Sequence, residues 1–167
     1  MFLLYFLIFI KMLHSEIRIV LNDLSSRINK EYGYKTFKRW YIFKTRIPRI
    51  NLGPCGPFAK LFHDMWNDFF KEKVTICFLF MTGKEYCLHC FVKLPTGEYF
   101  DGGAGLFVDV KSLGVWPSNT FIEEMKEYDE AKLEKNAFGL KRTYAECPSY
   151  SNEKVSEIIA LHLKKLL

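Results

Sequence analysis

The chain has 167 residues, of which 49% are hydrophobic and 17% aromatic, and its formal net charge is +5. This length suits one domain, residues 1–167, with a core of its own, and this composition excludes a disordered chain. The five cysteines are odd in number and irregularly spaced. That pattern argues against a disulfide framework, so we expect free thiols and a cytoplasmic protein.

The first ten residues, MFLLYFLIFI, are apolar and are followed by Lys11. This run is too short to cross a bilayer, so we expect no stable membrane span. It has the length of a signal-peptide core, but no basic residue precedes it and no small-residue cleavage motif follows it. Three interpretations of residues 1–11 stay open: a buried strand, a leader ahead of a true start at Met12, and a signal that would make the protein secreted.

Two apolar stripes at helical spacing predict helices. The first covers residues 15–28. The second begins near Pro57, which suits the first helical turn because no amide donor is needed there. Its members are Phe58, Leu61, Phe62, Met65, Trp66 and Phe69. The helix therefore begins next to Cys55.

The segment between these helices, residues 30–49, is basic and aromatic, and we expect it to be irregular or extended. It holds seven basic residues and one acidic residue, so its charge is +6 and that of the remainder is −1. Such a pattern is able to bind single-stranded nucleic acid through phosphate contacts and base stacking. Since no nucleic-acid-binding motif accompanies it, we prefer the interpretation that its aromatic side chains face the core and its lysines stay solvated.

Four short runs rich in apolar residues predict antiparallel strands. They cover residues 74–80, 86–94, 98–102 and 106–110. Two further helices are expected over residues 120–135 and 152–167. Helices, then strands, then a closing helix predict an α+β fold.

Cys55 lies in the stretch NLGPCGPFAKLF, between two Gly-Pro pairs and at the start of the second helix. The thiolate is the nucleophilic form of cysteine, and unpaired amides at a helix N-terminus stabilise it. A neighbouring imidazolium would stabilise it further. His89, in the second predicted strand, is the candidate for that role.

Asp101 is the candidate partner of His89. If Pro95-Thr96-Gly97 forms a three-residue hairpin loop with Gly97 in the left-handed conformation, Phe91 faces Asp101 across the ladder. His89 and Asp101 are then diagonal neighbours on one face of the sheet. A two-residue loop would place them on opposite faces. The loop therefore decides whether a Cys-His-Asp arrangement can form.

These residues resemble the Cys-His-Asp core of the papain-like superfamily. A GxC motif opens an amphipathic helix, His89 lies in LHCFVKL and Asp101 lies in GEYFDGG. The spacing of the cysteine, the histidine and the aspartate is nearest to that of the transglutaminase-like branch. Arylamine N-acetyltransferases show a related order of these residues. The resemblance covers about residues 51–105. It implies a papain-like fold, with N-terminal helices and the nucleophile helix packed on a small antiparallel sheet, and thiol-dependent acyl transfer or amide hydrolysis without a cofactor.

Two further interpretations concern neighbouring residues. The backbone N–H of Cys55 and the side-chain amide of Asn51 are candidate oxyanion-hole donors, Asn51 by analogy with the upstream glutamine of papain-like enzymes. The rival interpretation is a zinc site, in which Cys77, Cys147 and His89 would complete the pair Cys87 and Cys90. On a strand, however, Cys87 and Cys90 point to opposite faces and no second close pair exists, so we expect no metal.

The sequence therefore predicts a cysteine hydrolase or acyltransferase that acts on a peptide, a protein or a small-molecule amide or ester through a cysteinyl thioester. Cys55 would be the nucleophile, His89 the base and Asp101 its orienting partner. The alternative is a non-catalytic binding module of the same fold. That module would contact nucleic acid or an acidic partner through residues 30–49.

Overall fold

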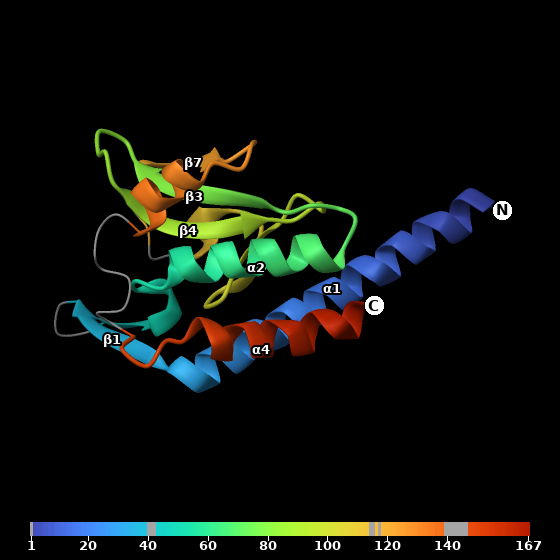
Figure 1. Ribbon diagram of the computed structural model, residues 1–167, viewed down its shortest axis with the longest axis horizontal. Helices are drawn as coiled ribbons and strands as arrows, with labels where there is room; N and C mark the ends of the chain where they lie inside the picture. Colours follow the sequence, from blue (N-terminus) through green and yellow to red (C-terminus); the bar gives the residue numbers. More distant parts are fainter. Residues whose placement is uncertain (1, 40–42, 114–115, 117, 139–146) are drawn as a thin grey trace.

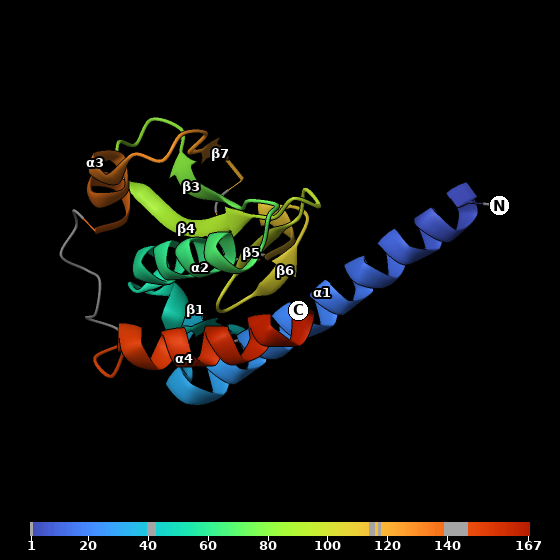
Figure 2. The same cartoon turned by 45° about the vertical axis from the view of Figure 1, so that its right-hand side comes forward.

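The computed structural model describes residues 2–39, 43–113, 116, 118–138 and 147–167 (Figure 1). The first element is α1 (Phe2–Tyr32), which contains the predicted helix and extends it in both directions. The stripe of Val20, Leu21, Leu24 and Ile28 is buried, as expected. The N-terminal part of α1 extends beyond the rest of the chain (Figures 1 and 2). The interpretation of the apolar run as a buried strand is therefore wrong.

Within the described part of the chain, no helix combines the length and apolar character needed to cross a bilayer.

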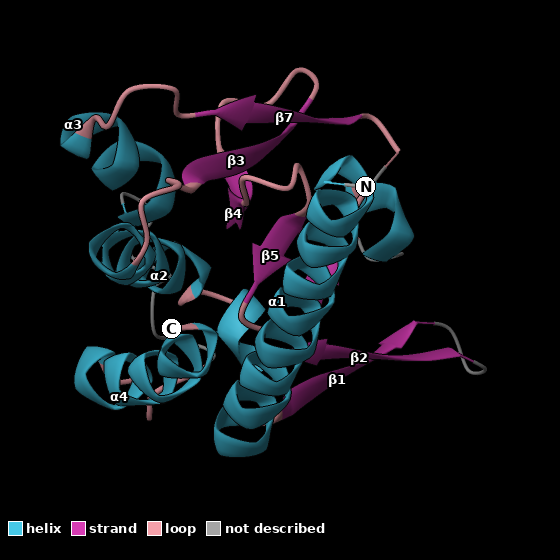
Figure 3. Cartoon of the chain, turned by 90° about the vertical axis from the view of Figure 1, so that its right-hand side faces the viewer, coloured by secondary structure: helices cyan, strands magenta, loops and turns pink. Residues whose placement is uncertain are grey.

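Strands β1 (Tyr34–Arg39) and β2 (Phe43–Pro48) form a separate two-stranded antiparallel ribbon. Figure 3 shows this ribbon beside α1, extending away from the other helices. Tyr34 and Phe37 are exposed, whereas Tyr32 at the end of α1 is buried. The preferred interpretation, that the aromatic side chains of this segment face the core, is therefore wrong for Tyr34 and Phe37. Trp40 and Tyr41 lie outside the described residues.

The main sheet has five antiparallel strands in the order β6-β5-β4-β3-β7. Their bounds are β3 (Thr75–Met81), β4 (Cys87–Lys93), β5 (Tyr99–Asp101), β6 (Gly105–Phe107) and β7 (Thr120–Glu124). The central strands β3 and β4 have almost continuous buried runs. This is the burial expected of strands covered on both faces.

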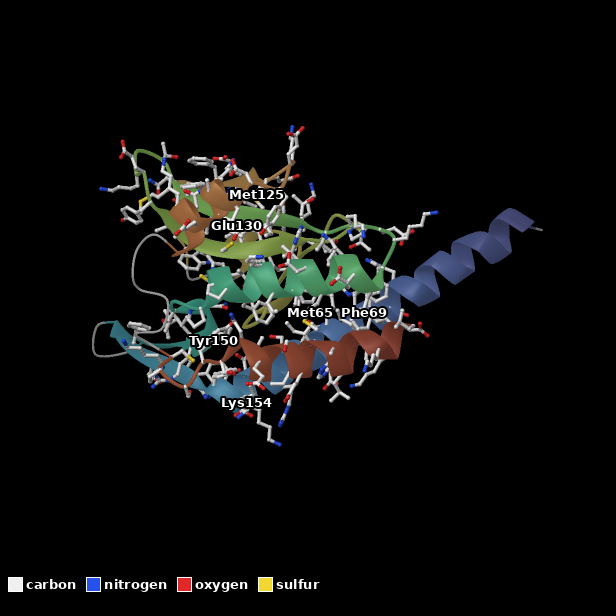
Figure 4. All side chains as sticks on the ribbon, in the orientation of Figure 1. Met65, Phe69, Met125, Glu130, Tyr150 and Lys154 are labelled. Atoms are coloured by element: carbon white, nitrogen blue, oxygen red, sulfur yellow. The ribbon has the colours of Figure 1, made fainter. Side chains whose placement is uncertain are left out.

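Helix α2 (Cys55–Phe69) packs against β4, and α4 (Asn152–Leu163) packs against both α2 and α1. The sheet, α2, and the α1–α4 pair therefore form successive layers (Figures 1 and 3). Met65 and Phe69 project from α2 towards α4 (Figure 4). The structure is thus α+β, as predicted.

Two predicted elements differ from the structure. Residues 120–135 are not one helix: β7 pairs with the edge of β3, and only the short α3 (Glu130–Leu133) and the π-helical turn η3 (Glu134–Phe138) follow it. The predicted strand over residues 106–110 is shorter, because β6 ends at Phe107 and the 3-10 turn η2 (Val110–Leu113) follows. In both places, residues form a strand only where a neighbouring strand of the sheet offers backbone hydrogen bonds.

Candidate active site

Cys55 is the first residue of α2 and is half-buried. Pro54 is the N-cap, and the 3-10 turn η1 (Arg49–Asn51) lies just before it. Pro57 lies in the first turn, as predicted, and the first turn has no acidic residue. The amides at this helix end therefore stabilise a negative charge on the Cys55 sulfur, with no carboxylate of the first turn to oppose it.

His89 and Asp101 meet on neighbouring strands. The loop before β5 has the predicted three-residue form: Gly97 is left-handed with φ 87°, and the Leu94 amide donates to the Glu98 carbonyl over 2.8 Å. This loop sets the pairing of β4 with β5. As a result His89 Nε2 lies 3.0 Å from Asp101 Oδ2, and both side chains are at most 1% exposed. The loop prediction is confirmed.

A β-bulge adjoins His89. Opposite β3, the register places Leu79 against His89 and Phe80 against Cys87, so Leu88 is an extra residue on β4. Bulges redirect the side chains beside them.

The Cys55 thiol lies near enough to His89 for the imidazole to lower the pKa of the thiol. Because Nε2 is bound to Asp101, the nitrogen left for the thiol is Nδ1, which is buried and makes no hydrogen bond to the described residues. Three side chains from α2, β4 and β5 thus come together: His89 is hydrogen-bonded to Asp101, and Cys55 lies near the imidazole.

The charges in this group favour a thiolate–imidazolium pair. Burial acts to raise the pKa of Cys55, but the nearby imidazole of His89, its positive charge and the Cys90 backbone amide outweigh burial, so the pKa lies below its usual value. Burial acts to lower the pKa of His89, but Asp101 and then Cys55 raise it to about 10. The low pKa of one group and the high pKa of the other have the same cause.

Asp101 has four hydrogen-bond donors. Its Oδ2 faces His89, and its Oδ1 accepts from Asn51 Nδ2 over 3.0 Å, from the Gly103 amide over 2.7 Å and from the Ala104 amide. Burial acts to raise the pKa of this carboxyl, but His89 and the other donors hold it below its usual range. The carboxylate is therefore fixed in place and charged.

Asn51 joins this site through its hydrogen bond to Asp101. One of its two amide hydrogens is used by the carboxylate. The observed role of Asn51 is thus to position Asp101. Its role in an oxyanion hole stays a prediction and would depend on the second hydrogen.

Three polar residues of α1 hold the loop after Asp101, and sequence reasoning missed them. Ser25 Oγ and Asn29 Nδ2 donate to the Gly103 carbonyl over 2.9 and 2.7 Å, and Asn22 Oδ1 accepts from the Leu106 amide over 3.2 Å. Their spacing of three and four residues could have indicated them, because it places all three on one face of the helix, next to the buried apolar stripe.

Trp116 covers the imidazole and was also missed. Its ring stacks on that of His89, with centroids 5.2 Å apart and planes 25° apart. The ring therefore shields the buried His89–Asp101 pair from water. It comes from an irregular segment after η2, and no local pattern there marks it.

The other four cysteines differ from Cys55, although all five are free thiols. Burial raises the pKa of Cys77 and of Cys87 to about 12, and it raises the pKa of Cys90 and Cys147 as well. In the described residues no three His, Cys, Asp or Glu side chains are grouped as metal ligands. Cys55 is thus the one cysteine whose pKa is lowered.

Comparison of the chain with protein-family models, with curated proteins and with solved structures finds no match in any of the three.

Proposed function

We propose that this protein is a papain-like cysteine enzyme that hydrolyses or transfers acyl groups through a thioester on Cys55. The observation that carries the proposal is the buried His89–Asp101 pair, with the Cys55 thiol near enough to the imidazole for its pKa to be lowered. A nucleophile at a helix start, a base and an orienting acid are the parts that thiol-based acyl transfer requires. The α2 helix packed on an antiparallel sheet supports the papain-like assignment.

The roles follow from the tautomer of His89. Asp101 accepts the Nε2 hydrogen, which leaves the lone pair on Nδ1 to take the proton of Cys55. The thiolate attacks the carbonyl carbon of an amide or ester, and a carbon–sulfur bond forms as the carbonyl oxygen becomes negative. The backbone N–H of Cys55 is the first donor for that oxygen.

The second half of the reaction reuses the same imidazole. His89 returns its proton to the leaving amine or alcohol as the old bond breaks, which gives a thioester on Cys55. Water or an amine then attacks the thioester, and His89 accepts its proton. Water completes hydrolysis and an amine completes transfer. The substrate class is a peptide, a protein or a small-molecule amide or ester.

Alkylation with a chloroacetamide probe at neutral pH tests this proposal. We expect mass spectrometry of the digested protein to place the label on Cys55 well before the other cysteines. The thiolate fraction of each thiol depends on its pKa, and only that of Cys55 is lowered. The His89→Ala variant should lose most of this selectivity.

Cys87→Ser is the matched control, because Cys87 is also half-buried but has a raised pKa. Its loss should leave the labelling rate of Cys55 unchanged. Equal labelling of all five cysteines, or of none, would favour a non-catalytic binding module.

A further inference from the structure

The ribbon of β1 and β2 carries the excess positive charge of the protein. Residues 34–48 hold five basic residues and no acidic one, so this segment accounts for the whole net charge of +5. The five are Lys35, Lys38, Arg39, Lys44 and Arg46. A dense charge of one sign attracts the opposite sign over about 8 Å at physiological salt.

Two aromatic rings of the ribbon are partly exposed to solvent, and a cationic side chain lies over one face of each. Tyr34 and Phe37 are 39% and 38% exposed. The Arg46 guanidinium lies 4.5 Å from the centre of the Tyr34 ring, and Lys35 Nζ lies 5.2 Å from that of Phe37. Each cation occupies a ring face on which a base of single-stranded nucleic acid would stack. This arrangement favours ionic contacts over base stacking.

Neither strand of the ribbon has a third strand beside it among the described residues. In the part of the chain that the structure describes, β1 and β2 pair only with each other. The outer N–H and C=O groups of a strand can pair with an extended peptide that adds a third strand. A polypeptide can use these backbone groups in regular alternation, whereas a nucleic acid cannot.

The base of the ribbon adjoins the candidate active site. Strand β2 ends at Pro48, and η1 leads from there to Cys55. Pro48 and Asn51 both lie against Gly103, since a Cβ on Gly103 would come within 2.6 Å of Pro48 Cβ and of Asn51 Nδ2. Gly103 donates to Asp101 in turn. A segment bound to the ribbon would therefore lie beside the turn that holds Asp101, at the edge of the candidate active site.

We propose that the ribbon of β1 and β2 is the docking site for an extended, acidic segment of a polypeptide substrate. This inference rests on the proposed function, because it names the substrate class of the same site. Docking on the ribbon raises the effective concentration of the substrate's acyl group beside Cys55. Acidic side chains are selected by the five cations, and the backbone of the segment pairs with the outer edge of a strand.

The test measures binding to the Cys55→Ala protein by fluorescence anisotropy, so that covalent chemistry does not interfere. The probes are a fluorescein-labelled peptide of ten glutamates, a matched peptide of ten glutamines and a ten-nucleotide oligo(dT). We expect the glutamate peptide to bind at least about tenfold more tightly than the other two, and its affinity to fall as salt rises.

A charge-removal variant locates the site. In the same background, Lys38→Gln, Lys44→Gln and Arg46→Gln together should weaken glutamate-peptide binding at least about tenfold. The matched control removes three exposed lysines from outside the ribbon by Lys71→Gln, Lys84→Gln and Lys126→Gln. Its effect should be several-fold smaller. Circular dichroism establishes that both variants are folded.

Three results would overturn the inference. The first is equal affinity for the glutamate and glutamine peptides. The second is an equal loss of glutamate-peptide affinity in the ribbon variant and the control variant. The third is tighter binding of oligo(dT) than of the glutamate peptide, which would make the ribbon a nucleic-acid site. Because the assay does not use the thiol, failure of peptide binding leaves the labelling of Cys55 standing. Failure of labelling, in turn, leaves the binding result standing.

Discussion

Replacing Asp101 by Asn removes the charge that holds His89 while changing the shape of the side chain little. The His89–Asp101 bond is 3.0 Å long, and both side chains are almost fully buried. A hydrogen bond to a charged group contributes about 1.5–3 kcal/mol. At 1.36 kcal/mol per unit this equals about one to two pKa units. The pKa of His89 should fall from about 10 by that amount, and the pKa of Cys55 should rise.

The expected result is a loss of thiolate at low pH. At a pH below the wild-type pKa of Cys55, the alkylation rate should fall by up to about 10- to 100-fold in Asp101→Asn, because a rise of one to two pKa units lowers the thiolate fraction there by that factor. The amide also favours the other tautomer of His89, which places the hydrogen on Nδ1 and opposes proton transfer from the thiol.

The assay is the rate of chloroacetamide alkylation of Cys55 between about pH 5 and pH 9. In the variant the rising limb of the profile should move to higher pH. Asp109→Asn is the control, since Asp109 is exposed and caps only its own turn. A folded Asp101→Asn protein with the same pH profile as wild type would refute the reasoning, because Asp101 would then not govern the thiolate.

Two further predictions concern the turn around Asp101. Gly103→Ala should destabilise the fold by about 1–3 kcal/mol and slow alkylation of Cys55, because the new Cβ would come 2.6 Å from Asn51 Nδ2 and Pro48 Cβ. Urea unfolding measures the first effect and the alkylation rate measures the second. The control is Gly83→Ala, where a Cβ meets nothing within 4 Å, and it should slow alkylation little. The folded pKa of Asp101 lies below its usual 3.8, so its contribution to stability is present above that pH and is lost as pH falls through the folded pKa. The difference in unfolding free energy between wild type and Asp101→Asn should therefore shrink as the pH falls below about 4, and a constant difference would contradict this.

Local chemistry was sufficient to predict the parts of the site that depend on a few consecutive residues. Pro57 and the apolar stripe after it place Cys55 at the start of α2, because proline suits a first helical turn and the stripe needs a core to face. Gly97 selects a three-residue loop, and the alternation of a strand then places His89 and Asp101 on one face. Each of these consequences follows from backbone geometry within one hairpin or one helix end.

Only the tertiary structure decided how these parts meet. Residues 120–124 become a strand because the edge of β3 offers them hydrogen bonds, which the charged run in the sequence does not indicate. The Gly103 carbonyl is held by Ser25 and Asn29, more than 70 positions earlier in the chain, and Trp116 stacks on His89 from an irregular segment. Such contacts arise when separately formed surfaces pack together, and no periodicity in the sequence records which surfaces those are. The sequence by itself thus determined the reactive groups and their local placement, whereas packing decided that a half-buried thiol comes near a buried imidazole and carboxylate.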